Sequence, residues 1–374
     1  MADETTVFAI AMTKRGGILG SRTNKIPAYI TQTDDVADYA TANDDGLDFS
    51  VKEYPCITYY VNSKSDGTTT GPQETGDGSK ENPFCNLNTI FKSDKFICLT
   101  SSFCCLCVKV IITGTIDYYL NGRDRNFHNR LILDFQTDLV LNWNKDKHGL
   151  SMTIVQSCVG VNFNNFHFIT NISNQVTNSP GQVDIYTYCF SGCSNCVFYN
   201  NTGEISMRNS VTGTHANDHA ALYVEYFTGC HGAQILGCDI TVDMNSRGQE
   251  TDDSDASVAH TRTAIIYGSS NVVVIRSKFK VKCVSFAGDH SSGGSTFVAG
   301  IAQAFGLYSC SNALLSSTSI SCSASAGASS YKSSKIACAL GSQAQYHNCS
   351  FSASSIDNNG TNGWTSSYNF TCFK

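Results

Sequence analysis

The sequence predicts an all-β fold made of stacked coils, a solenoid, and three observations support this prediction. Charged residues make up only 15% of the chain while hydrophobic residues make up 41%, a balance that favours β structure over helical bundles or disorder. No proline lies beyond Pro180, and proline is kept out of inner strands because it cannot donate a ladder hydrogen bond. The third observation is an apolar pattern that recurs six times after residue 159.

The recurring pattern consists of two short runs of alternating apolar residues, at positions +1 and +3 and at positions +6, +8 and +10. In the copy counted from Gly232 these positions hold Ala233, Ile235, Cys238, Ile240 and Val242. The six copies begin at Gly160, Asn195, Gly232, Asn271, Asn312 and Gln343. Alternation with period two predicts strands whose every second side chain points inward. The phase shift between the two runs predicts a corner.

The copies start 31 to 41 residues apart, and variable spacing around a fixed pattern is expected when loops of different length connect the coils of a solenoid. One copy is irregular. It begins well with Cys196 and Phe198, but we interpret the segment NNTGE as a slip of about two residues before Ile205 and Met207.

The pattern resembles the right-handed parallel β-helix, the pectin-lyase-like superfamily. The segment YYVNSKSDGTTTGPQETGDGSKENPFCNLNTIF (59–91) is similar to the lead-in that often precedes such helices, and VKVIITGTIDYYL and NRLILDFQTDLVLNW resemble less regular first coils. The resemblance covers roughly residues 57–355 and implies the fold, not an activity, because one fold carries many functions. An antiparallel sandwich is the alternative, although it gives no reason for a six-fold repeat.

Both ends of the chain lie outside the repeat. Residues 1–56 are polar and acidic, and we expect an attachment segment, an oligomerisation arm or a cap, since an open solenoid end is a template for aggregation. Residues 356–374 are expected to form a C-terminal cap over the last coil. Its aromatic residues are Trp364, Tyr368, Phe370 and Phe373.

Cysteines recur at position −2 of the pattern, which predicts a buried column. These cysteines are Cys158, Cys193, Cys230 and Cys310, with Ser269 and Gly341 in the other copies. Buried free cysteine packs as a small hydrophobe. The CxxC at Cys193 and the CCxC at Cys104 look like zinc half-sites, but zinc needs four converging ligands, so no metal site is assigned. Disulfides between coils are the third alternative.

Acidic residues and histidines gather in three segments between coils, at 214–220, 249–262 and 287–294. Consecutive coils would place these segments side by side and so form an acidic patch edged by Arg262. The catalytic candidates are Asp218, Asp252, Asp253, Asp289 and His290, and the ligand-binding candidates are Asp255, His260, Arg262 and Tyr267. Paired carboxylates suit glycoside hydrolysis, and carboxylate oxygens suit Ca²⁺, which is the one cofactor considered. The alternative is that these loops are simply solvated.

Aromatic residues offer a further possibility, a sugar-binding groove. The candidates are Tyr223, Tyr226, Tyr267, Tyr308 and Tyr331, and we expect some of them to belong to the core instead, since tyrosine is common in strands.

Composition narrows the possible partners. A net charge of −6 argues against nucleic acid, because phosphate binding needs a basic surface. No apolar run approaches the roughly 18 residues of a membrane span. The start, MADETTVFAIAMTKRGG, lacks the features of a secretory signal. We therefore expect synthesis in the cytoplasm, where thiols stay reduced, although the even count of 18 cysteines leaves disulfides open.

Two functions remain open. The first is a non-enzymatic fibre or spike of a phage virion or a similar released particle, anchored to other particle proteins through residues 1–56 and touching cell-surface polysaccharide. The resemblance to phage spikes implies a homo-oligomer, with a trimer favoured. The second is a polysaccharide lyase or glycoside hydrolase acting through the acidic patch. The catalytic motifs of known lyases and polygalacturonases are not recognisable here, so we carry no activity over from the resemblance.

Overall fold

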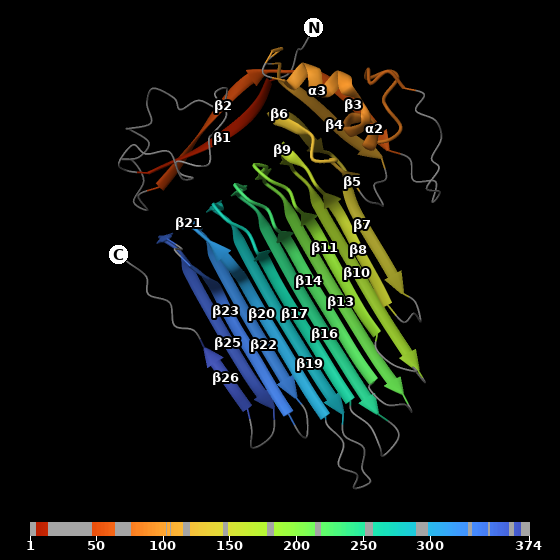
Figure 1. Cartoon of the computed structure of the whole chain (residues 1–374), viewed down its shortest axis with the longest axis vertical. Helices are drawn as coiled ribbons and strands as arrows, with labels where there is room; N and C mark the ends of the chain where they lie inside the picture. The colour runs from red at the N-terminus through yellow and green to blue at the C-terminus, as the bar shows by residue number, and fades with distance from the viewer. Residues whose placement is uncertain are drawn as a thin grey trace.

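The structure is a computed structural model in which three parallel sheets wind into a β-solenoid of about five turns (Figure 1). It describes residues 5–13, 47–63, 76–101, 103–104, 106–114, 120–144, 149–177, 183–213, 218–250, 257–288, 298–327, 331–342, 345–358 and 363–367. The predicted parallel β-helix is thereby confirmed, and the antiparallel sandwich is excluded, because every strand pairing within the three sheets is parallel in the described residues.

We name the sheets I, II and III in the order in which one coil enters them. Sheet I, in the described part of the chain, consists of β3 (Ile57–Ser63), β4 (Val108–Gly114), β6 (Asn126–Phe135), β9 (Val159–Asn164), β12 (Val197–Tyr199), β15 (Gln234–Leu236), β18 (Val273–Ile275), β21 (Leu314–Ser316) and β24 (Gln345–His347). From β12 onward its strands are short, because they carry only the +1/+3 run of the pattern.

Sheet II carries the +6/+8/+10 run. Its described strands are β7 (Asp138–Asn144), β10 (His167–Thr177), β13 (Thr202–Gly213), β16 (Asp239–Glu250), β19 (Lys278–Gly288), β22 (Ser319–Gly327) and β25 (Ser350–Asn358). Sheet III comes next along the chain. Its described strands are β5 (Leu120–Asn121), β8 (Gly149–Gln156), β11 (Val183–Ser191), β14 (Asp218–Thr228), β17 (Ser257–Tyr267), β20 (Val298–Ser311), β23 (Tyr331–Ser342) and β26 (Gly363–Ser367).

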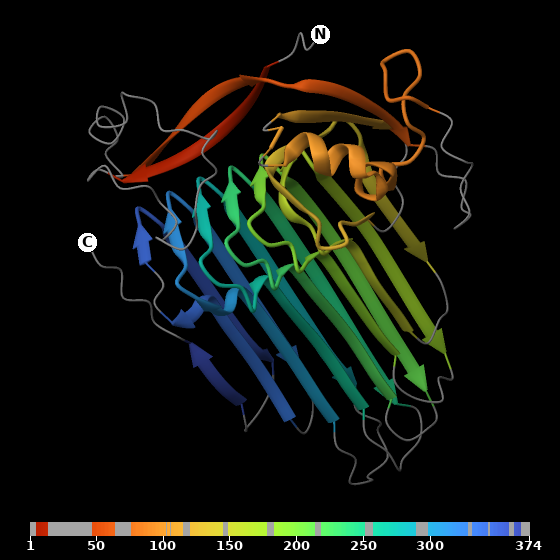
Figure 2. The same cartoon turned by 45° about the horizontal axis from the view of Figure 1, so that its top comes forward.

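Sheets II and III face each other, and sheet I joins them along one edge (Figure 2). Buried polar pairs link the two long sheets, as where Thr261 Oγ1 lies 2.8 Å from Ser285 Oγ. The three sheets enclose an aromatic core, in which the ring centroids of Phe163 and Phe198, at position +3 of adjacent copies, are 5.4 Å apart and those of Phe190 and Phe198 are 4.7 Å apart. The inward positions of the pattern are therefore the core, as predicted.

The predicted corner lies at position +5, where all six copies have a left-handed backbone. The residues are Asn165, Asn200, Gly237, Arg276, Ser317 and Asn348, with φ between 47° and 63°. Asparagine tolerates this conformation better than most residues do. Neighbouring copies also bond to each other, since Asn200 Nδ2 donates to Asn165 Oδ1 over 2.7 Å. The corner thus explains the phase shift between the two runs.

The prediction that the pattern slips by about two residues in the copy that starts at Asn195 is wrong. Strand β13 pairs in unbroken register, with Gly203 opposite Ile240 and Ile205 opposite Val242. Position +6 is Asn201, which is fully buried and whose Oδ1 accepts a bond from the Phe166 backbone N–H over 2.8 Å. The inward positions of this copy are therefore occupied by a polar residue and a glycine, which hid the pattern.

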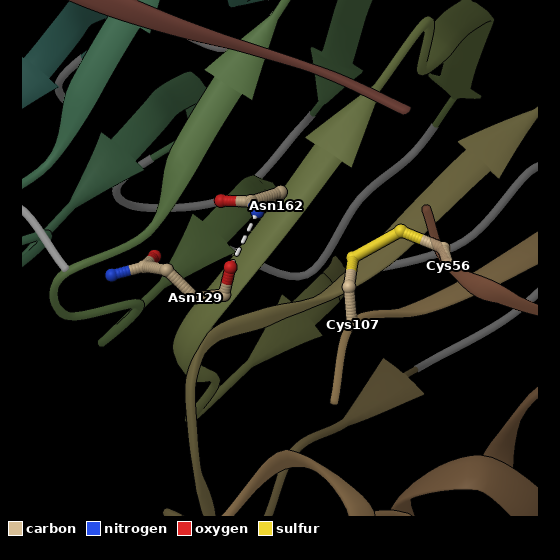
Figure 3. Close-up of a disulfide and its surroundings, with 4 residues drawn as sticks. All are labelled: Cys56, Cys107, Asn129 and Asn162. Atoms are coloured by element: carbon tan, nitrogen blue, oxygen red, sulfur yellow. Dashed lines mark hydrogen bonds between the residues drawn. A yellow bond between two sulfur atoms is a disulfide. The ribbon is translucent and has the colours of Figure 1, made fainter. Parts of the chain in front are cut away.

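The first coil is covered by two short helices, α2 (Asn88–Lys92) and α3 (Asp94–Thr100). A disulfide joins Cys56 and Cys107, next to the paired strands β3 and β4 (Figure 3). Nearby, Asn162 Nδ2 donates to the Asn129 carbonyl over 2.9 Å, which ties β9 to the left-handed turn at Asn129 (Figure 3).

The two ends contain further strands. In the N-terminal segment, β1 (Thr5–Thr13) pairs antiparallel with β2 (Leu47–Pro55) as a separate ribbon, and sheet I begins directly after it at Ile57. In the C-terminal segment, β26 continues sheet III, with Trp364 opposite Ser333. The expected cap residues Tyr368, Phe370 and Phe373 lie outside the described residues.

Candidate functional site

A row of tyrosines lies on the outer face of sheet III, and we call it the tyrosine strip. Its members are Tyr186, Tyr188, Tyr223, Tyr267 and Tyr308, all partly exposed. They come from four consecutive strands, β11, β14, β17 and β20, that pair in regular parallel register. Because strands of one sheet lie about 4.8 Å apart, residues in the same register position of adjacent coils stack on one another.

The centre of the strip is a stacked pair. Tyr186 and Tyr223 are register partners, and their ring centroids lie 4.5 Å apart with an interplanar angle of 5°. The next residue in the same row is Arg262 of β17. The row therefore passes from two stacked rings, whose edges point outward, to a cation within three coils.

Hydrogen bonds fix the two central rings. The Tyr186 hydroxyl donates to Asp184 Oδ2 over 3.3 Å, and the Tyr223 hydroxyl lies 2.9 Å from His260 Nδ1. Burial is the main reason that the pKa of Tyr223 lies above its usual range, and the nearby Tyr186 hydroxyl and Asp184 carboxylate raise it further. Tyr223 therefore stays protonated at neutral pH, and it is the donor wherever His260 Nδ1 is unprotonated.

Arg262 connects the strip to the next coils. Its guanidinium carbon lies 5.0 Å from the Tyr267 ring centroid and 5.3 Å from that of Tyr308, which are cation–π distances. On the other side its Nη2 is 3.9 Å from Glu225 Oε1. The two aromatic rings and the carboxylate together hold the arginine against the sheet.

Glu225 is the carboxylate at the middle of the strip, and only 16% of its side chain is exposed. Burial raises its pKa above the usual value, although the Thr228 side chain and the Arg262 charge partly offset this. Burial and the Glu225 charge likewise raise the pKa of Tyr188. The strip thus contains an acid held near a cation and flanked by neutral phenols.

The structure describes only some of the catalytic and ligand-binding candidates that were predicted from the sequence. It brings His260, Arg262 and Tyr267 together on the outer face of β17, within the strip. Asp218 is the first residue of β14, where its backbone pairs with Ser257. The remaining candidates, Asp252, Asp253, Asp255, Asp289 and His290, lie outside the described residues, so the expected acidic patch stays a prediction.

The groove tyrosines divide between surface and core. Tyr223, Tyr267 and Tyr308 belong to the strip, but Tyr226 is fully buried and packs at 4.9 Å from Phe227. Tyr226 is therefore a core residue. Strand β23 contains Tyr331, and its side chain is outside the described set.

The patterns recognised in the sequence do not single out Glu225, Tyr186, Tyr188 or Asp184. A signal for them exists, because the strands of sheet III precede each copy of the pattern. At position −9 the successive copies have Tyr186, Tyr223, Arg262 and Gln303, and at position −7 they have Tyr188, Glu225, Ala264 and Phe305. Extending the pattern backward from position −2 would have shown these outward columns.

The cysteine column is a packing feature, as predicted. Cys158, Cys193, Cys230 and Cys310 are buried and carry free thiols, and the Cys230 Sγ lies 3.5 Å from the Phe190 carbonyl. Burial raises the pKa of the Cys230 thiol well above its usual value. No group of three or more His, Cys, Asp or Glu side chains among the described residues could hold a metal ion.

A pocket of about 370 Å³ lies beside the first coils, on the outer face of sheet I. It is lined by Tyr60, Asn62, Lys80, Pro83, Ile111, Thr113 and Gln136. This lining offers no carboxylate or imidazole, whereas the strip contains Glu225 and His260.

Comparisons with known proteins leave the family open. No family model matches the chain, and no curated protein or solved structure matches it. No described helix is long and apolar enough to cross a membrane. The function therefore has to be inferred from the geometry of the strip and from the solenoid itself.

Proposed function

We propose that this protein is a non-enzymatic structural and adhesion shaft, a fibre or spike of a virion-like particle, and that the tyrosine strip contacts a cell-surface polysaccharide. The observation that carries the proposal is the Tyr186–Tyr223 stack continued by Arg262. Because these two rings stack on each other, they turn their edges and hydroxyl groups outward, and an amphipathic ring edge can contact both the apolar C–H groups and the hydroxyl groups of a pyranose. An outward strip on a rigid sheet offers several such contacts in line.

The rest of this proposal concerns assembly. A solenoid with an N-terminal segment that is not part of its coils suits a shaft anchored at one end, and the pectin-lyase-like and phage-spike resemblance favours a trimer. Residues 1–56 would contact the other particle proteins. Deleting residues 1–55 leaves Cys56 for its bond to Cys107 and should abolish incorporation into particles. A shaft incorporated equally well without this segment would contradict the anchoring role.

The strip is tested by glycan binding. We expect the wild-type chain to bind a subset of bacterial surface polysaccharides on an array, and Tyr223→Ala to reduce that binding at least tenfold. Tyr223→Phe keeps the ring and should retain most of the affinity. Tyr60→Ala is the matched control, because Tyr60 lies on the outer face of sheet I. Equal binding by Tyr223→Ala and wild type would refute the assignment.

A second candidate function is depolymerisation, and a specific observation favours it. Glu225 has a raised pKa beside Arg262, and the Tyr223 hydroxyl bonds His260. Perturbed acids beside a fixed cation are common in sites of general acid–base chemistry. If the chain cleaves a polysaccharide, Glu225→Gln and His260→Gln should each lower the rate at least a hundredfold, read as new reducing ends or unsaturated product. If the wild-type chain binds the polysaccharide without cleaving it, depolymerisation is refuted and adhesion is supported.

A further inference from the structure

A second surface, on the opposite sheet, has a different chemistry. On β19 the outward residues Lys278, Lys280 and Lys282 are exposed, while Phe279 and Val281 between them are buried. Alternate residues of a strand lie about 6.7 Å apart on one face, so the three ammonium groups form an evenly spaced row. We call these three residues the lysine row.

The lysine row is only partly neutralised by its neighbours. On β16, Asp239 and Asp243 lie 3.7 Å and 3.9 Å from the Nζ atoms of Lys278 and Lys282. The central Lys280 has Thr241 as its register partner on one side and Ser321 on the other. Asp243 is also shared with Arg208, at 3.0 Å. The two aspartates are therefore outnumbered by the cations around them.

Beyond the row lies a flat field of hydroxyl groups. Strand β22 presents Ser319, Ser321 and Ser323 beside the three lysines, and β25 presents Ser350, Ser352 and Ser354 beside those serines. Ser352 and Ser321 bond over 2.9 Å, and Ser354 and Ser323 over 3.2 Å. No acidic residue occurs in β22 or in residues 350–356. Cations backed by hydroxyl donors suit anionic oxygens.

The row ends at an exposed aromatic ring. Phe286 occupies the same outward face of β19 as the lysines and is 43% exposed, although most large apolar side chains of the solenoid are buried. The Arg247 guanidinium carbon lies 5.3 Å from the Phe286 ring centroid. A sugar ring can stack on such a face, whereas a purely electrostatic surface would not need one.

We propose that the outer face of β19, from Lys278 to Phe286, is a second binding site, for a polysaccharide that carries anionic groups such as sulfate, phosphate or carboxylate. The regular row supplies charge complementarity, the serines supply hydrogen bonds, and Phe286 supplies a stacking face. This site lies on sheet II, so it is independent of the tyrosine strip on sheet III. The chain has a net charge of −6, so the local excess of cations at this face favours anionic ligands there.

The test uses the full chain, immobilised at low salt, with chondroitin sulfate, polygalacturonate and a phosphate-bearing teichoic acid as probes and neutral dextran as reference. We expect binding of at least one anionic probe, lost at high salt because surface charges are screened. Lys280→Gln should weaken binding about two- to fivefold, the size expected for one exposed charge. Replacing all three lysines by glutamine, and Phe286→Ala, should each weaken it at least tenfold.

The controls separate this site from net charge and from the strip. Replacing Lys80, Lys92 and Lys95 by glutamine removes the same charge from the chain elsewhere, and should leave binding within twofold of wild type. Arginine at the three row positions should preserve it, and so should Tyr223→Ala. The proposal is overturned if no anionic probe binds, if dextran or DNA binds as tightly as the best of them, or if the row and Phe286 variants bind like wild type.

Discussion

The Tyr226 ring occupies the space in which a side chain at residue 203 would lie. A Cβ added to Gly203 would come within 2.6 Å of Tyr226 Cε2 and 3.0 Å of its hydroxyl oxygen. The ring, in turn, is fully buried, and its hydroxyl donates to the Thr202 carbonyl over 3.4 Å. Gly203 of β13 therefore leaves room for the large, buried Tyr226 ring of β14, and the two residues are complementary in size.

Gly203→Ala should consequently destabilise the fold by about 1–3 kcal/mol, the usual cost of overpacking a well-filled core. Chemical denaturation of the folded chain would measure this. In a double-mutant cycle, Tyr226→Leu should recover part of the loss caused by the alanine, because it removes the atoms that clash. Additive losses in the double variant would mean that the two positions do not interact.

Asn201 provides a second stability prediction. Its buried Oδ1 accepts the Phe166 backbone N–H, so Asn201→Ala should leave that donor without its partner and cost about 1–3 kcal/mol. Asn200→Gly, at the adjacent exposed corner position, is the matched comparison and should cost less, because glycine also tolerates the left-handed backbone there. The unfolding midpoints of the two variants measure the difference, and an equal loss in both would contradict a special role for the buried amide.

The raised pKa of Glu225 gives a pH prediction. Because the folded state binds its proton more tightly than the unfolded state does, stability should fall as pH rises from the unfolded pKa through the folded pKa. Glu225→Gln removes this contribution, so it should flatten the stability profile across that window and stabilise the chain at neutral pH. Melting temperatures measured from pH 4 to pH 8 would show it. A mutant profile parallel to wild type would contradict the assigned shift.

The cysteine column predicts which substitutions the core accepts. Ser269 occupies the position that cysteine holds in the adjacent coils, and it accepts the Cys230 backbone N–H over 2.9 Å. Cys230→Ser should therefore cost only about 1 kcal/mol, whereas Cys230→Leu should cost about 1–3 kcal/mol through overpacking. Thermal unfolding of both variants checks the order, and a serine variant less stable than the leucine variant would refute it.

Much of the solenoid could be predicted because its coils share one pattern. The alternation of apolar residues predicts the inward column that contains Ile240. The phase shift between the two runs predicts the corner at Asn165 and at the equivalent positions of the other copies. The pattern failed at Asn201 and Gly203 because hydrogen bonding and the shape of a distant ring, not apolarity, decide those two positions. Neither requirement is visible in a local stretch of sequence.

The candidate site was harder to predict. Segments of different length separate β13 from β14 and β16 from β17, so the outward columns of sheet III are obscured unless the coils are aligned from their cysteines. Tyr223 and Tyr226 are three residues apart, so alternation alone places one outward and the other inward, as the structure does. Tyr226 and Phe227 are buried consecutively, although alternation would place Phe227 outward, and this break obscures the assignment of faces in β14.

The free thiols in the core give the chain built-in chemical reporters. Cys158, Cys193, Cys230 and Cys310 sit in different coils and are closed to solvent in the folded state. An alkylating reagent can reach each one only when its own coil opens. Mass spectrometry of labelled peptides would then reveal the order in which the coils of the solenoid unfold under heat or pulling force, without any engineered probe.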